Sequence, residues 1–141
     1  MVTRELEAGL ITLDTSAVLA SIDRTDPNHD RVIDALARAR GPLVLPIAIL
    51  SEVTYLVEEN LGTHILESFI WTIVEHQFIL DCGDQDIARI HTLVVRYRDL
   101  PLGFSDAAVI ACGERNGGLI ATLDYRHFGV VAGEGTIRIV P

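Results

Sequence analysis

Apolar residues fall in short runs of strand length that alternate with longer segments of helical spacing. The strand-length runs cover residues 10–13, 43–45, 78–80, 119–123 and 136–140. Between these runs, apolar residues recur at three- and four-residue intervals, as in Ile49, Val53, Leu56 and Val57. Short apolar strands that alternate with helices predict an α/β fold, in which helices cover both faces of a parallel sheet.

Turn and capping residues set the predicted limits of the helices. Asp26-Pro27 predicts a helix start, with Asp26 as the N-cap and Pro27 in the first helical position. Ser105 is predicted to cap a helix that runs from Asp106 to Asn116. Because no repeat, low-complexity tract or linker interrupts the pattern, residues 1–141 are interpreted as a single domain, with residues 1–9 as a short polar lead-in.

Four acidic residues stand out because each adjoins an apolar or small-residue stretch. Asp14 and Asp124 directly follow predicted strands, and Glu52 and Asp106 lie on predicted helices. Ligands of open parallel sheets bind beyond the carboxyl ends of the strands, so the two strand-end aspartates indicate a site. Each acid taken alone could be a helix cap or a first-turn residue favoured by the helix dipole. Other acids, such as those of Asp84-Gln85-Asp86, lie in polar surroundings and are interpreted as solvated.

Converging carboxylates repel one another unless a counter-charge is present, and a divalent cation supplies that charge. An all-oxygen ligand set suits Mg²⁺ or Mn²⁺ rather than zinc. The chemistry that such a site favours is hydrolysis of a phosphoester by metal-activated water. The candidate ligands are therefore Asp14, Glu52, Asp106 and Asp124.

Charge and composition narrow the class of protein further. The formal net charge of −9 argues against a general nucleic-acid coat protein but leaves a nuclease open, because bound cations cancel an acidic site. All eleven basic residues are arginine. The absence of lysine argues against haloacid-dehalogenase-like phosphatases and phosphoacceptor receiver domains, which rely on a lysine near the phosphoryl group. The phosphatases also want a second aspartate at the position of Ser16.

The acidic segments resemble the PIN domain and, more narrowly, the VapC toxins of bacterial type II toxin–antitoxin modules. The resemblance spans residues ~10–140 and rests on the order and spacing of four segments: Leu13–Ala17, Leu50–Val53, Ser105–Ala111 and Ala121–Phe128. It implies a three-layer α/β/α sandwich and an endoribonuclease that depends on Mg²⁺ or Mn²⁺. Asp14, Glu52, Asp106 and Asp124 take the positions of the metal-site acids, with Ser16 and Thr122 as supporting hydroxyl groups.

The same resemblance implies an RNA substrate, a homodimer, and a cognate antitoxin that forms a hetero-oligomer with the toxin. Two alternatives stay open on the sequence. One is a PIN-like interaction module that has lost activity, although all four acids are present. The other is a metal-dependent nuclease that acts on DNA, which no residue excludes.

Residues around the acids receive simpler interpretations. Arg126 is a candidate contact for RNA phosphates at the rim of the pocket, because its guanidinium presents a fork of donors. His127 is interpreted as structural, because a PIN-like mechanism needs no histidine base. Phe69 and Trp71 could serve the core, a dimer interface or an antitoxin surface.

The cysteine pattern and the hydropathy bear on location. Cys82 and Cys112 each lie in an apolar segment and are interpreted as two buried thiols. No apolar run reaches the ~20 residues of a membrane span, and the first residues lack the features of a signal peptide. We therefore expect a cytoplasmic protein without a membrane anchor.

Overall fold

The centre of the computed structural model, which describes residues 9–141, is a five-stranded sheet. Neighbouring strands are parallel throughout, in the order β3-β2-β1-β4-β5. The strands are β1 (Ile11–Leu13), β2 (Leu43–Pro46), β3 (Phe78–Asp81), β4 (Leu119–Ala121) and β5 (Arg138–Val140). Of the predicted lead-in, residues 1–8 lie outside the described part of the chain.

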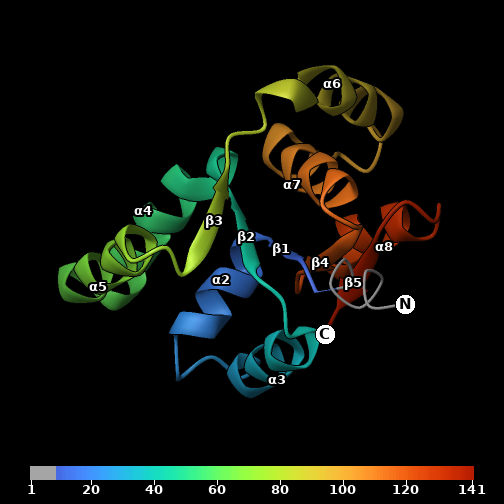
Figure 1. Cartoon of the computed structure of the whole chain (residues 1–141). Helices are drawn as coiled ribbons and strands as arrows, with labels where there is room; N and C mark the ends of the chain where they lie inside the picture. The colour runs from blue at the N-terminus through green and yellow to red at the C-terminus, as the bar shows by residue number, and fades with distance from the viewer. Residues whose placement is uncertain (1–8) are drawn as a thin grey trace.

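Helices cover both faces of this sheet (Figure 1). Right-handed crossovers place the helices between β1 and β3 on one face, and those that follow β3 on the other. The first group is α2 (Thr15–Ile22), α3 (His29–Ala39), α4 (Leu50–Leu61) and α5 (Thr63–Val74). The second group is α6 (Ile87–Arg96), α7 (Phe104–Arg115) and α8 (Tyr125–Ala132). The predicted three-layer α/β/α sandwich with a parallel sheet is therefore confirmed.

Helix α7 packs on β1, β2 and β4 and is the most buried helix of its layer. All residues from Ala107 to Gly113 are buried. Gly113 allows a close approach to β4, because a Cβ atom at this position would lie 2.5 Å from Cγ1 of Ile120. This packing fixes the beginning of α7, and with it Asp106, relative to the central strands.

The order of the strands creates a crevice next to β1. The chain moves from β1 outward through β2 to β3, and then returns to the opposite side of β1 to add β4 and β5. The carboxyl ends of β1 and β4 thus lie at the point where the direction of winding reverses, which is where open α/β sheets bind ligands. Asp14 and Asp124 follow these two strands.

Two predicted helix starts are wrong by two residues. α3 begins at His29, because Oδ1 of Asp26 accepts a hydrogen bond from the Asn28 amide at 2.7 Å and closes a turn before the helix. α7 begins at Phe104 after an extended Gly103, so Ser105 lies within the first turn and is not the N-cap. None of the helices within residues 9–141 is long and apolar enough to span a membrane.

Tertiary packing changes the interpretation of several single residues. Both cysteines are free thiols, but only Cys112 is buried, whereas Cys82 is exposed. Phe69 belongs to the core, and Trp71 is 59% exposed. Asp86 is buried and binds Arg115 through a 2.9 Å hydrogen bond from Nε to Oδ1, so its interpretation as a solvated acid is wrong.

Candidate metal site

Asp14 is the most buried of the four predicted acids, with an exposure of 6%. It stands between the end of β1 and the start of α2, as its sequence position predicts. Burial raises the pKa of its carboxyl group, and the nearby charge of Asp124 adds to this rise. Hydrogen bonds from Thr122 and Ser16 act in the opposite direction, because they stabilise the ionised form.

Two hydroxyl groups connect Asp14 to the end of β4. Ser16 Oγ and Thr122 Oγ1 both donate to Oδ2 of Asp14, at 3.0 and 2.9 Å. The same oxygens accept from the backbone: Ser16 from the Leu123 amide at 2.9 Å, and Thr122 from the Asp124 amide at 3.0 Å. Each hydroxyl group thus bonds both to Asp14, beyond the end of β1, and to a backbone amide beyond the end of β4. These bonds fix the spacing of the two strand ends.

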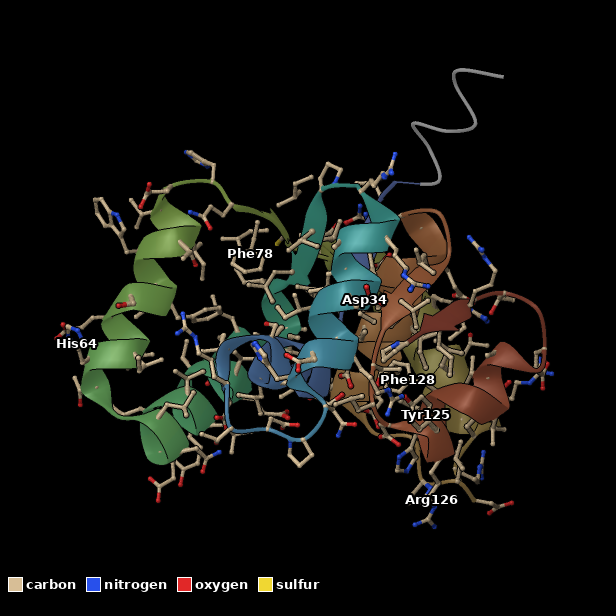
Figure 2. All side chains as sticks on the ribbon, turned by 90° about the horizontal axis from the view of Figure 1, so that it is seen from below. Asp34, His64, Phe78, Tyr125, Arg126 and Phe128 are labelled. Atoms are coloured by element: carbon tan, nitrogen blue, oxygen red, sulfur yellow. The ribbon has the colours of Figure 1, made fainter. Side chains whose placement is uncertain are left out.

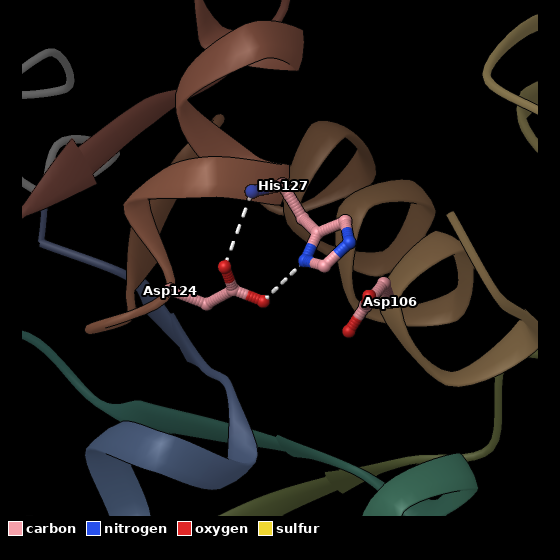
Figure 3. A group of neighbouring side chains, drawn as sticks. All are labelled: Asp106, Asp124 and His127. Carbon is pink, nitrogen blue, oxygen red and sulfur yellow. Dashed lines mark hydrogen bonds and ion pairs between the residues drawn. The ribbon is translucent and has the colours of Figure 1, made fainter. Parts of the chain in front are cut away.

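Asp124 caps α8 and is held by a single residue through two bonds. Oδ1 accepts the backbone N–H of His127 at 3.1 Å, the usual bond of a capping aspartate. Oδ2 lies 2.8 Å from Nδ1 of the same histidine (Figure 3). Ligand atoms of Asp106, Asp124 and His127 all lie within 4.8 Å of one another.

Asp106 lies in the first turn of α7 and faces this pair across the site (Figure 3). Desolvation, together with the charges of Asp14 and Asp124, raises the pKa of its carboxyl group to about 6. His127 lowers this pKa, and Glu52 makes a further small contribution that raises it. The pKa of Asp106 therefore registers the charges of all three other predicted acids, which links the four electrostatically.

Glu52 and Arg126 lie at the periphery. Glu52 is exposed in the first turn of α4, and its influence on Asp106 is the smallest that contributes to the pKa. Arg126 is exposed on the first turn of α8 and extends away from the body of the molecule (Figure 2). Among residues 9–141, Arg126 forms no ion pair with the four acids, so the structure adds no support for its predicted contact with phosphate.

The donor set fits a divalent cation. Asp106, Asp124 and His127 offer ligand atoms close enough together to hold one cation. Asp14 and Glu52 are not part of this group and act on Asp106 through their charges. Desolvation is the largest cause of the rise of the Asp106 pKa to about 6, and the neighbouring carboxylate charges add to it. A cation bound here would relieve that charge repulsion.

His127, interpreted from the sequence as structural, lies within the group of possible ligands, a position that the sequence interpretation did not predict. A local signal does exist, because an N-cap aspartate followed by histidine three residues later brings both groups to the same helix end. The signal is weak, since it does not reveal which way the imidazole ring turns. The structure turns it toward Asp124, and with it toward Asp106.

Comparison with known proteins gives this arrangement a family context. The family model of the PIN domain matches residues 11–134. Ribonuclease VapC26 from Mycobacterium tuberculosis is 29% identical over 133 residues, which cover 92% of this chain and 98% of that protein.

Solved structures agree on the fold. The crystal structure of M. tuberculosis VapC20, a sarcin-ricin loop cleaving toxin, has a TM-score of 0.73 at 19% identity and covers 93% of this chain and 99% of its own. DNA-bound VapBC from Salmonella typhimurium has a TM-score of 0.68 at 17% identity, with coverages of 92% and 95%. VapBC2 from Rickettsia felis, bound to a promoter DNA fragment, also has a TM-score of 0.68, at 13% identity, with coverages of 92% and 96%. With the family model matched over nearly the whole described chain, the protein belongs to the PIN domain family.

Proposed function

We propose that this protein is the toxin of a VapC-type toxin–antitoxin module, a divalent-cation-dependent endoribonuclease that acts in the cytoplasm. The observation that carries the proposal is the group of Asp106, Asp124 and His127, whose ligand atoms lie within 4.8 Å of one another. Burial and the charges of Asp14 and Asp124 raise the pKa of Asp106 in this group to about 6. The relationship to Ribonuclease VapC26 supports RNA as the substrate. The preferred cation is Mg²⁺ or Mn²⁺, because carboxylates dominate the ligand set.

In this proposal, Asp14, Asp106, Asp124 and Glu52 hold the cation. A bound divalent cation would lower the pKa of a water molecule and stabilise the charge that develops on a phosphodiester group. The hydrogen bonds from Ser16 and Thr122 orient the Asp14 carboxylate and favour its ionised form, against the effect of burial. Burial of Asp14 excludes bulk water from its side of the site, which strengthens the electrostatic interactions there.

Cleavage of RNA tests the proposal directly. We expect the protein to cut RNA in the presence of Mg²⁺ or Mn²⁺, to lose activity in EDTA, and to lose it in an Asp14→Asn variant. A Glu59→Gln variant is the matched control, because it removes one carboxylate charge from an exposed position two turns beyond Glu52 on α4. Equal activity in the wild type, in EDTA and in Asp14→Asn would refute a metal-dependent nuclease.

The two alternatives give different outcomes in the same assay. DNA of the same sequence, digested side by side with the RNA, reports a deoxyribonuclease if only the DNA is cut. An interaction module without activity cuts neither substrate under any cation. Mapping of RNA ends after brief induction in cells, with Asp14→Asn as the comparison, then identifies the RNA that is cleaved.

We further propose a cognate antitoxin that inserts a basic side chain among the acids, together with a toxin homodimer in the assembly. The two VapBC structures with the same fold give this proposal its precedent. Purification of the protein after co-expression with the neighbouring gene tests the partner, and light scattering of the free toxin tests the dimer. Recovery of only free monomeric protein would contradict both.

A further inference from the structure

The carboxylate of Asp124 is held at both of its oxygens by one residue. The backbone N–H of His127 donates to Oδ1 at 3.1 Å, and the imidazole Nδ1 lies 2.8 Å from Oδ2 (Figure 3). An aspartate side chain has two rotatable bonds, so two bonds from different directions fix its position and its orientation. Each carboxylate oxygen retains a further acceptor position, which stays available to a cation.

The need to cap α8 explains only the first of these two bonds. Capping is satisfied once Oδ1 accepts the backbone N–H, and any residue at position 127 other than proline supplies that donor. The bond to Nδ1 is a property of the histidine side chain. The bond is part-buried, because the side chains of His127 and Asp124 are 22% and 32% exposed.

The imidazole also lies within reach of Asp106. Its ligand atom is within 4.8 Å of those of both Asp106 and Asp124. A carboxylate that binds a cation needs a fixed orientation, and outer partners that supply this orientation have large effects on metal affinity. His127 occupies the place of such a partner for Asp124, as Ser16 and Thr122 do for Asp14.

The geometry assigns His127 the role of a positioning residue, whose Nδ1–H holds the Asp124 carboxylate in the orientation that binds the divalent cation. This inference rests on the proposed function only in taking Asp124 as a cation ligand. A positioning role differs from a direct ligand role, because Nδ1 of His127 then bonds to Asp124 and not to the cation. The two roles predict different behaviour for asparagine and glutamine, whose amide groups replace Nδ1 and Nε2 of the ring respectively.

The test measures Mn²⁺ binding by isothermal titration calorimetry in four variants of the full chain. We expect His127→Asn to bind Mn²⁺ within about threefold of the wild type, and His127→Gln and His127→Ala to bind it about tenfold or more weakly. His91→Gln, an exposed histidine on α6, is the matched control and should bind as the wild type does. Thermal unfolding in EDTA should change little in all four variants, which separates positioning from a purely structural role.

Two results would overturn the inference. One is unchanged Mn²⁺ affinity in His127→Gln and His127→Ala. The other is a loss in His127→Asn as large as that in His127→Gln, because an amide at the Nδ1 position would then fail to replace the ring.

RNA cleavage in the same samples separates this inference from the proposed function. The expected pattern of Mn²⁺ affinities in a protein that cuts no RNA would support the positioning role and refute the ribonuclease. RNA cleavage that requires Asp14 but not His127, with Mn²⁺ affinities unchanged in the His127 variants, would support the ribonuclease and refute the positioning role.

Discussion

Replacement of Asp106 by asparagine should stabilise the cation-free protein, although it removes a residue of the proposed active site. The pKa of the Asp106 carboxyl group is about 6, against an ordinary value of 3.8. Desolvation and the charges of Asp14 and Asp124 are the main causes. Asparagine has nearly the same shape but no charge, so it removes this unfavourable interaction without leaving a cavity.

The size of the effect follows from the pKa and two corrections. A rise of about two pKa units corresponds to a ceiling of about 3 kcal/mol of unfavourable free energy in the ionised folded state. Because Asp106 is only half-buried, screening by solvent reduces this to about 1–2 kcal/mol. Loss of a first-turn charge that favours the helix dipole costs about 0.5 kcal/mol. The net gain should be about 1 kcal/mol, or a rise of about 3–5 °C in Tm.

The pH dependence has a defined sign. The folded-state pKa of Asp106 is raised above its unfolded value, so the folded protein binds the proton more tightly. The carboxyl group therefore costs nothing well below its ordinary pKa of 3.8, where both states are protonated. The cost grows as pH rises from about 4 to 6 and is complete above that range. The advantage of Asp106→Asn should thus be full at pH 7.5 and mostly lost at pH 4.

Urea denaturation in EDTA at pH 7.5 and at pH 4 measures both quantities. Glu59→Gln is the charge-matched control and should differ from the wild type by less than about 0.5 kcal/mol at either pH. Addition of Mn²⁺ should reverse the order, because the wild type gains more from binding than Asp106→Asn does. A variant that is less stable than the wild type by more than the helix-dipole loss in EDTA at pH 7.5 would refute the reasoning. A gain in the free energy of unfolding at pH 4 as large as that at pH 7.5 would also refute it.

Two further predictions concern the supports of the site. Thr122→Val removes a hydrogen bond that lowers the pKa of Asp14, so the acid limb of the pH profile of RNA cleavage should move to higher pH. Thr122→Ser keeps the hydroxyl group and should keep the wild-type profile. Identical profiles for the wild type and both variants would contradict this. Gly113→Ala should lower the free energy of unfolding by about 1–3 kcal/mol, because its Cβ would lie 2.5 Å from Cγ1 of Ile120. Gly129→Ala on α8 meets no atom within 4 Å and should be neutral or stabilising by up to about 1 kcal/mol, as urea denaturation would report.

The layers of the fold could be predicted from periodicity, but the order of the strands could not. Apolar runs such as Phe78–Leu80 and Leu43–Leu45 look alike in sequence. In the structure, Leu45 is fully buried, whereas Ile79 and Leu80 are more than 40% exposed, because β3 forms an edge of the sheet. Which strand becomes an edge depends on how the helices pack, and no local pattern encodes that packing.

The position of two acids was predictable for a physical reason. Asp14 directly follows β1, and Asp124 lies three positions after the last residue of β4. The carboxyl ends of parallel strands meet at one edge of the sheet. The pairing of Asp86 with Arg115 was not predictable, because it joins positions 29 residues apart through the packing of α6 on α7. The contact of His127 with Asp124 was missed for a different reason. Its residues are close in sequence, but the bond depends on a side-chain rotation.

Support within the acidic cluster is distributed unevenly, and this explains why Asp106 is the residue to perturb. Asp14 has two hydroxyl donors, and Asp124 has two donors from His127. Within residues 9–141, no hydrogen bond to the Asp106 carboxylate is found. The hydroxyl donors to Asp14 favour its ionised form. Desolvation, followed by the charges of Asp14 and Asp124, raises the pKa of Asp106. The pKa values of Asp14 and Asp106 are both raised, but hydrogen bonds offset the rise at Asp14 and not at Asp106. Asp106, at the start of the helix that packs most deeply on the sheet, is therefore the carboxylate to perturb.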